Sequence, residues 1–119
     1  MRIFLFSLTL LGALLSGCAT LGIKDDSLGL QITPQPVKRG QPALAKVDAP
    51  MDSSKVVGVV ETFGSPTLIF AKDEKKEIWF FYGTIPFSPW VKPGTYKVRV
   101  SAYPPTGDPH YTEMKVDLQ

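Results

Sequence analysis

The sequence predicts an all-β protein, built as a small antiparallel β-sandwich of about seven strands. Three observations favour this class. Short runs rich in β-branched and aromatic residues recur along the chain, and several alternate apolar and polar residues with the period of two that is typical of strands. Eleven prolines and ten glycines separate these runs and leave no amphipathic stretch of helical length after the N-terminal segment. A chain of 119 residues is also sufficient for only one domain.

Seven runs have the length and composition of strands. They cover residues 28–33, 43–48, 55–63, 67–71, 77–82, 96–102 and 112–118. The clearest alternation lies in the sixth run, where Tyr96, Val98 and Val100 share one face and Lys97 and Arg99 share the other. One face of that strand is therefore expected to be buried.

A charged turn over residues 72–76 separates the fourth and fifth runs. Turn residues between two strand-like runs predict a hairpin. Mixed charges at a hairpin tip normally keep the turn solvated, which is the favoured interpretation of this cluster. The alternative is that the cluster faces acidic lipid or polymer.

The N-terminal residues have the pattern of an export signal, because Arg2 precedes an apolar run over residues 3–15. As a helix at about 1.5 Å per residue this run would reach about 20 Å, whereas the hydrocarbon core of a bilayer is about 30 Å thick. A cleaved signal peptide is therefore favoured over a transmembrane anchor.

Leu15, Ser16, Gly17 and Cys18 follow this run and resemble the lipobox of bacterial lipoproteins, Leu-[Ala/Ser]-[Gly/Ala]-Cys, at all four positions. The resemblance implies cleavage before Cys18, a diacylglyceryl thioether on its thiol and, in many Gram-negative bacteria, acylation of the new amino terminus. Two acyl chains already give stable membrane anchoring. The alternative is an ordinary secretory signal with an incidental cysteine.

Ala19 stands after the cysteine, where Asp commonly retains lipoproteins of enteric bacteria at the inner membrane. The resemblance therefore implies an outer-membrane protein facing the periplasm, with the inner membrane and the cell surface left open. The expected organisation is a signal peptide over 1–17, a lipidated cysteine and tether over 18–27, and one domain over 28–119.

Composition narrows the classes of partner. The net charge of +2 gives no broad basic surface, which excludes nucleic acid as an expected partner. Cys18 is the only cysteine, so the domain has no internal disulfide and depends on its apolar core.

A second resemblance covers residues 56–102. The residues that carry it are Val56–Val59, Phe63–Gly64, Leu68–Phe70, Trp79, Gly83 and Lys92–Val98. Their order is similar to the immunoglobulin-like domain that precedes the catalytic domain in some lysostaphin-like zinc peptidases of the cell envelope. The resemblance implies an immunoglobulin-like sandwich that acts as a positioning or binding module.

The sequence offers little for catalysis. Zinc peptidase chemistry needs at least two histidines and a carboxylate, and His110 is the only histidine of the chain. A serine-type triad could pair His110 with Asp108, but a solvated loop histidine explains the pattern more simply, and Gly-x-Ser-x-Gly is absent. Glycine-rich phosphate-binding motifs are absent as well. We therefore expect no enzyme, no metal and no cofactor.

Aromatic residues are the best candidates for a binding site. The run from Trp79 to Tyr82 contains four consecutive aromatic residues, and a strand cannot bury consecutive side chains on one face. Either the strand is covered on both sides or some rings are exposed. Phe87 and Trp90 follow in a proline-flanked loop.

We expect Phe87, Trp90, Trp79 and Phe81 to form a contact surface for a protein partner. The alternatives are a platform on which sugar rings of peptidoglycan or another envelope polysaccharide stack, or a structural role in which Trp79 and Trp90 cap the core. The sequence therefore predicts a non-catalytic envelope lipoprotein that binds protein, with a glycan-binding module as the second hypothesis.

Overall fold

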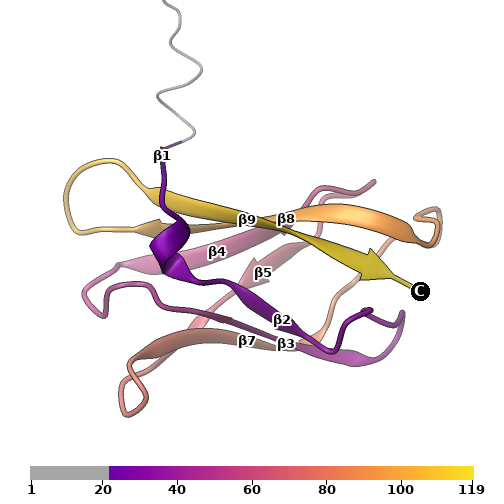
Figure 1. Cartoon of the computed structure of the whole chain (residues 1–119), viewed down its shortest axis with the longest axis horizontal. Coiled ribbons are helices and arrows are strands. Elements are labelled where there is room, and N and C mark those ends of the chain that lie inside the picture. The colour runs from indigo at the N-terminus through magenta and orange to yellow at the C-terminus, as the bar shows by residue number, and fades with distance from the viewer. Residues whose placement is uncertain (1–21) are drawn as a thin grey trace, which may run out of the picture.

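The computed structural model describes residues 22–119 as two packed β-sheets (Figure 1). The elements are β1 (Ile23–Lys24), the 3-10 helix η1 (Asp26–Leu28), β2 (Gln31–Thr33), β3 (Pro42–Val47), β4 (Lys55–Val60), β5 (Thr67–Ile69), β6 (Ala71–Asp73), β7 (Ile78–Thr84), β8 (Gly94–Tyr103) and β9 (His110–Leu118). The expected signal peptide and Cys18 lie outside the described residues. Within the described part, no helix is long and apolar enough to cross a membrane.

The predicted all-β sandwich is confirmed. One sheet has the order β1-β9-β8-β4-β5 and the other has the order β2-β3-β7-β6. Strand pairs are antiparallel except β1 with β9, which is parallel. The orders β2-β3-β7-β6 and β9-β8-β4 correspond to the two sheets of an immunoglobulin domain, with β5 added at one edge.

A tyrosine corner supports the immunoglobulin-like assignment. Tyr96 lies near the start of β8, and its hydroxyl donates a hydrogen bond to the carbonyl of Lys92 in the preceding loop. This contact ties the loop to the strand that it enters, as in other sandwiches of this class.

The core lies between the sheets and consists of the inward-facing residues of each strand. On β8, Val98 and Val100 are fully buried. Gly58 on β4 faces the same space, where a side chain would meet Val100 and the ring of Phe70 at 3.3 Å. Glycine at this position lets the Phe70 ring pack directly against the sheet.

Three predicted strands differ from the observed ones. The run 55–63 ends as β4 at Val60, so Phe63 lies in the following loop. Leu28 belongs to η1 because Asp25 caps that helix and Gly29 ends it with φ of 59°, so the strand begins at Gln31. The run 67–71 divides into β5 and β6, which lie in different sheets. The chain crosses between the sheets at the buried Phe70. The hairpin expected across the charged turn is formed by β6 and β7.

The two ends of the sandwich carry different loops. We call the end of the sandwich that carries β1 the tether end. There Ile23 pairs with His110 and His110 pairs with Ala102, so β1 lies beside the β8–β9 loop. At the far end, Gly94 pairs with Leu118. Figure 1 shows β1 and the C-terminus at opposite ends of the molecule. Ile23–Lys24 and η1, in the segment expected to be a tether, lie against the domain.

Candidate functional site

The four predicted binding aromatics do not form one surface. Trp79 is only 6% exposed, and its indole Nε1 donates a hydrogen bond to the carbonyl of Pro50 at 3.2 Å. Phe81 and Phe87 are half-buried and pack against the core. Trp90 is 76% exposed. Trp79 therefore caps the core, whereas Trp90 is available to a ligand.

The loop that carries Trp90 lies beside a loop with a second exposed aromatic residue, which sequence analysis did not select as a binding residue. Phe63, in the β4–β5 loop, is 68% exposed. The loops are neighbours, because a Cβ added at Gly64 would lie 3.8 Å from the Cβ of Ser88. We call Phe63 and Trp90 the aromatic rim. It lies at the far end of the sandwich, opposite β1.

Arg39 holds the loop that carries Trp90. Its guanidinium donates hydrogen bonds to the carbonyls of Ser88, at 3.1 Å, and of Val91, and lies 6.0 Å from the centroid of the Phe87 ring. The Val91 side chain is buried, and the Val91 amide donates to the Ser88 carbonyl at 3.0 Å. The loop is therefore ordered while the Trp90 ring is exposed.

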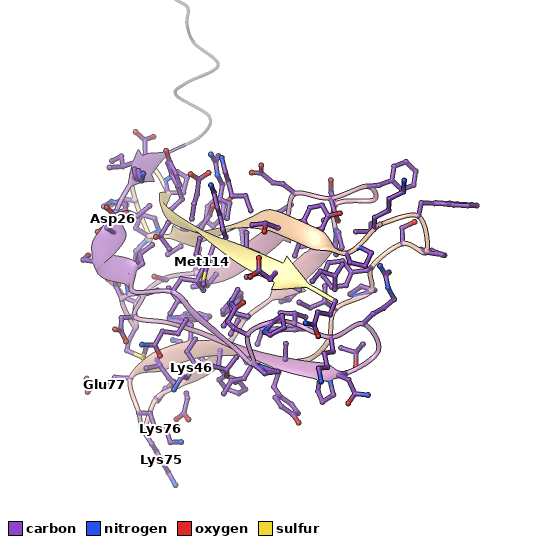
Figure 2. The ribbon with its side chains drawn as sticks, turned by 45° about the vertical axis from the view of Figure 1, so that its right-hand side comes forward. Asp26, Lys46, Lys75, Lys76, Glu77 and Met114 are labelled. Atoms are coloured by element: carbon purple, nitrogen blue, oxygen red, sulfur yellow. The ribbon has the colours of Figure 1, made fainter. Side chains whose placement is uncertain are left out.

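The outer face of the four-stranded sheet forms a shallow groove of about 430 Å³. Its lining residues come from β3, β7 and the β6–β7 hairpin. They are Leu44, Lys46, Asp73, Lys76, Ile78, Phe80 and Tyr82. Figure 2 shows Lys46 close to the hairpin that carries Lys76. We call this feature the sheet groove.

Strand register determines the order of side chains in the sheet groove. Tyr82 pairs with Leu44, and Phe80 pairs with Lys46 on one side and with Ala71 on the other. The Phe80 ring is half-buried and lies next to the small side chain of Ala71. The outward aromatic residues of the 77–82 run are Phe80 and Tyr82, and Tyr82 is 65% exposed.

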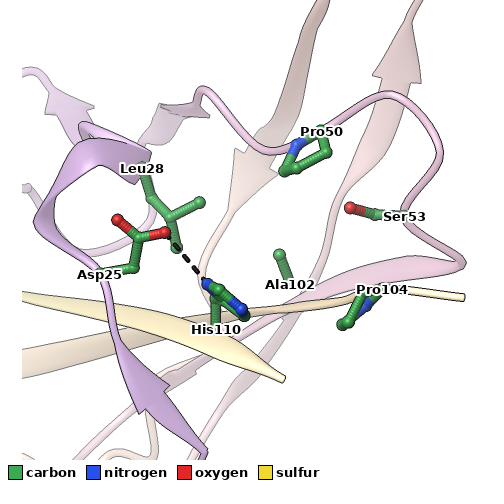
Figure 3. A pocket seen from close by; sticks show the side chains of 7 residues that line it. All are labelled: Asp25, Leu28, Pro50, Ser53, Ala102, Pro104 and His110. Carbon is green, nitrogen blue, oxygen red and sulfur yellow. Dashed lines mark hydrogen bonds and ion pairs between the residues drawn. The ribbon is translucent and has the colours of Figure 1, made fainter. Parts of the chain in front are cut away.

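A smaller pocket of about 140 Å³ opens at the tether end (Figure 3). His110 lies at its side, with Nδ1 3.1 Å from Oδ2 of Asp25. Hydrogen bonds from the Ser27 side chain and from His110 lower the pKa of the Asp25 carboxyl below its ordinary value of 3.8. The acid beside His110 is thus Asp25 rather than Asp108, and no local motif marked Asp25 as its partner.

Ser53 also lines the tether-end pocket, and Figure 3 places its hydroxyl on the pocket side. The Ser53 Oγ atom is buried and has no hydrogen-bond partner among the described residues. The nucleophile-to-base contact of a serine hydrolase is therefore not formed between Ser53 and His110. Residues 22–119 contain no group of three or more potential metal ligands.

Neither a known family model nor a curated protein matches the chain. The fold and the side chains therefore carry the functional argument.

Proposed function

We propose that the protein is a lipoprotein of the bacterial cell envelope, anchored at the outer membrane through Cys18 and facing the periplasm. Its immunoglobulin-like domain acts as a non-catalytic module that binds a protein partner through the aromatic rim of Phe63 and Trp90. The lipobox at residues 15–18 supports the anchor, and the two exposed rings support the binding role.

The observation that carries this proposal is the exposure of Trp90 in a braced loop. Covering a large exposed apolar ring on association is favourable, and tryptophan is enriched among the residues that dominate protein interfaces. Arg39 already orders the loop through the carbonyls of Ser88 and Val91. A partner would therefore pay little conformational entropy to bind the Trp90 ring.

The position of the anchor suits this role. Cys18 precedes Gly22 by four residues, which span at most about 14 Å when extended. Gly22 lies at the tether end with φ of 85°, and a Cβ there would lie 2.3 Å from the Pro109 carbonyl oxygen. A lipid on Cys18 would hold the tether end near the membrane, with the aromatic rim directed away from it.

In-cell photocrosslinking from residue 63 tests the protein partner. The crosslinker replaces Phe63 in an otherwise native chain, in a Trp90→Ala chain and in an Ile69→Ala chain. Ile69→Ala is the matched control because Ile69 is another strongly exposed apolar residue, at 68% against 76% for Trp90, but lies on the edge strand β5. We expect a specific protein adduct in the native and Ile69→Ala chains, and at least about a tenfold loss with Trp90→Ala.

Thermal unfolding of the same variants shows whether Trp90→Ala still folds. An unchanged adduct yield in the folded Trp90→Ala chain would show that the rim is not the contact. If that variant unfolds, Trp90 is a structural residue and the assignment is also wrong.

Metabolic labelling with radioactive palmitate tests the anchor. Cys18→Ser is expected to abolish labelling and to release the domain from the membrane fraction, because the thiol is the proposed acylation site. Ser16→Ala preserves the lipobox pattern and serves as the control that retains labelling. Labelling of the Cys18→Ser chain at the native level would defeat the lipoprotein assignment.

A further inference from the structure

We propose that the sheet groove is a second binding site, separate from the aromatic rim, and that it binds a neutral polysaccharide chain. The side chains of the groove indicate the class of ligand, a neutral polysaccharide. The further step, that this polysaccharide belongs to the cell envelope, rests on the proposed function.

Two aromatic rings lie next to each other in the sheet groove. Phe80 and Tyr82 project from the same face of β7, and side chains two residues apart on a strand are separated by about 7 Å. The faces of a pyranose ring consist of C–H groups and stack on aromatic rings, while the sugar hydroxyls remain at the edge. Two neighbouring rings on a flat sheet therefore match successive units of a linear sugar chain.

Charged side chains lie beside these rings in the sheet groove. Lys46 lies directly across from Phe80, and Lys76 and Asp73 line the same groove. Oδ1 of Asp73 accepts hydrogen bonds from the amides of Lys75 and Lys76 at 3.1 and 3.2 Å, which fixes the carboxylate at the groove. Ammonium donors and a carboxylate acceptor beside the rings suit hydroxyl groups, which both donate and accept.

The groove continues across the sheet. A second hollow of about 120 Å³ shares Lys46 and Ile78 with the sheet groove and adds Gln31 and Asp48. Along β7, the distance from Ile78 to Tyr82 is about 14 Å at the rise of an extended strand. The surface therefore suits an extended ligand rather than a compact one.

The charges favour a neutral ligand. The two lysines and Asp73 give the groove a net charge of only +1, and the adjoining hollow adds Asp48. Nucleic acid needs several unpaired cations along its path. A protein contact typically has an apolar centre with charged residues at its periphery. Here Lys46 lies directly across from the Phe80 ring inside the groove, which favours a hydroxyl-rich chain.

Titration calorimetry of the full chain, purified from membranes in detergent micelles, tests this site. The probes are chitotetraose, which has the amino sugar of cell-wall glycan, and cellotetraose, which has no acetamido groups. We expect the native chain to bind at least one of them and the Phe80→Ala/Tyr82→Ala chain to bind at least tenfold more weakly. Preference for chitotetraose assigns the cell wall as the source, and preference for cellotetraose assigns another envelope polysaccharide.

Trp90→Ala is the matched control, because it removes an exposed ring at the far end and leaves the groove intact. It is expected to keep full sugar affinity while losing the protein adduct, so that the two proposals fail independently. The groove proposal is overturned if the native chain binds neither sugar at millimolar concentration. It is also overturned if the folded Phe80→Ala/Tyr82→Ala chain binds sugar normally, or if it loses only the protein adduct.

Discussion

The outer faces of the two sheets differ in the ion pairs and hydrogen bonds that their charged side chains form. On the five-stranded sheet, Arg99 of β8 donates from Nε and Nη2 to Oε2 of Glu113 on β9, at 3.0 and 2.8 Å. The Arg99 guanidinium also lies 4.4 Å from the centroid of the Tyr111 ring. On the four-stranded sheet, the groove charges Lys46, Lys76 and Asp73 form no ion pair among the described residues.

This difference indicates which face is available to a ligand. Cross-strand pairs that satisfy each other stabilise a sheet and leave little to offer to a partner. On the five-stranded face, Arg99 and Glu113 use their charges on each other. On the four-stranded face, Lys46 and Lys76 have no ion-pair partner among the described residues and lie in the same groove as Phe80 and Tyr82.

The largest expected effect is a difference in unfolding free energy between substitutions on the inner and outer faces of β7. Trp79→Ala removes a buried ring and its hydrogen bond to Pro50, and is expected to cost about 3–5 kcal/mol of unfolding free energy. Phe80→Ala removes an outward ring and is expected to cost less than about 1 kcal/mol. Urea unfolding of both variants measures the difference. Equal losses would mean that the outer face of β7 contributes to stability as much as the core does.

Filling the sheet groove is the next test. Ala71 lies opposite Phe80 on the edge strand β6, and Ala71→Trp is expected to cover the Phe80 ring and to weaken tetrasaccharide binding at least tenfold. Lys72→Ala on the same strand is the control that leaves the groove lining unchanged. Calorimetry reports the affinity. Native affinity in the folded Ala71→Trp chain would place the sugar elsewhere.

Removing one charged side chain from each sheet face should have smaller effects, and the effects should differ between the faces. Arg99→Ala should reduce stability, whereas Lys46→Ala should reduce sugar binding. Arg99→Ala is expected to cost about 1 kcal/mol because Glu113 loses both hydrogen bonds from Arg99 and keeps only the 3.9 Å contact with Lys97. Lys46→Ala is expected to leave stability unchanged within about 0.5 kcal/mol and to weaken sugar binding. Chemical unfolding at neutral pH compares the two, and a larger stability loss for Lys46→Ala would reverse the comparison.

The cost of Arg99→Ala should depend on pH. Hydrogen bonding to Arg99 lowers the pKa of the Glu113 carboxyl below its ordinary value of 4.5. A depressed folded-state pKa contributes stability that is present above the unfolded value and lost as the pH falls through the folded value. The difference between native and Arg99→Ala chains should therefore shrink below pH 4.5, as measured by unfolding at a series of pH values.

The smallest expected effect concerns β1 at the edge of the five-stranded sheet. The Asp25 pKa is lowered by Ser27 and His110, so the contribution of the ionised carboxylate is present above pH 3.8 and lost as the pH falls through its folded-state pKa. Asp25→Asn keeps an N-cap but loses the charge. Hydrogen exchange of the Asp25 amide, which donates to Tyr111, should be faster in this variant at neutral pH.

Asp52→Asn, in an exposed loop, is the control for that exchange measurement. Exchange of residue 25 at the native rate in the Asp25→Asn chain would show that the carboxylate does not help to hold β1.

The two sheets also differ in how much of their structure the sequence predicted. The runs with regular alternation, 96–102 and 112–118, predicted β8 and β9 well, because one face of each is buried and the period of two records it. Alternation also placed Trp79 and Phe80 on opposite faces. Only the pairing of Trp79 with the buried Val47 identifies which face is inward, and that register depends on β3.

Other features leave no local pattern. Phe63 is exposed in a loop, where no periodicity distinguishes it from a core residue. Asp25 and His110 are 85 residues apart and meet only because β1 adds in parallel to β9. Leu28 is buried like a strand residue, although the capping by Asp25 places it in η1. The contact between Asp25 and His110 therefore depends on long-range strand pairing, which local sequence patterns do not record.

The parallel alignment of β1 with β9 has a mechanical consequence. Tension applied to the N-terminus pulls β1 along its own axis, away from the far end of the domain. The bonds from Ile23 to Pro109, at 2.8 Å, and from Asp25 to Tyr111, at 2.7 Å, then lie across the direction of pull and resist it together in shear. An antiparallel strand entering from the other end would instead be peeled away one bond at a time.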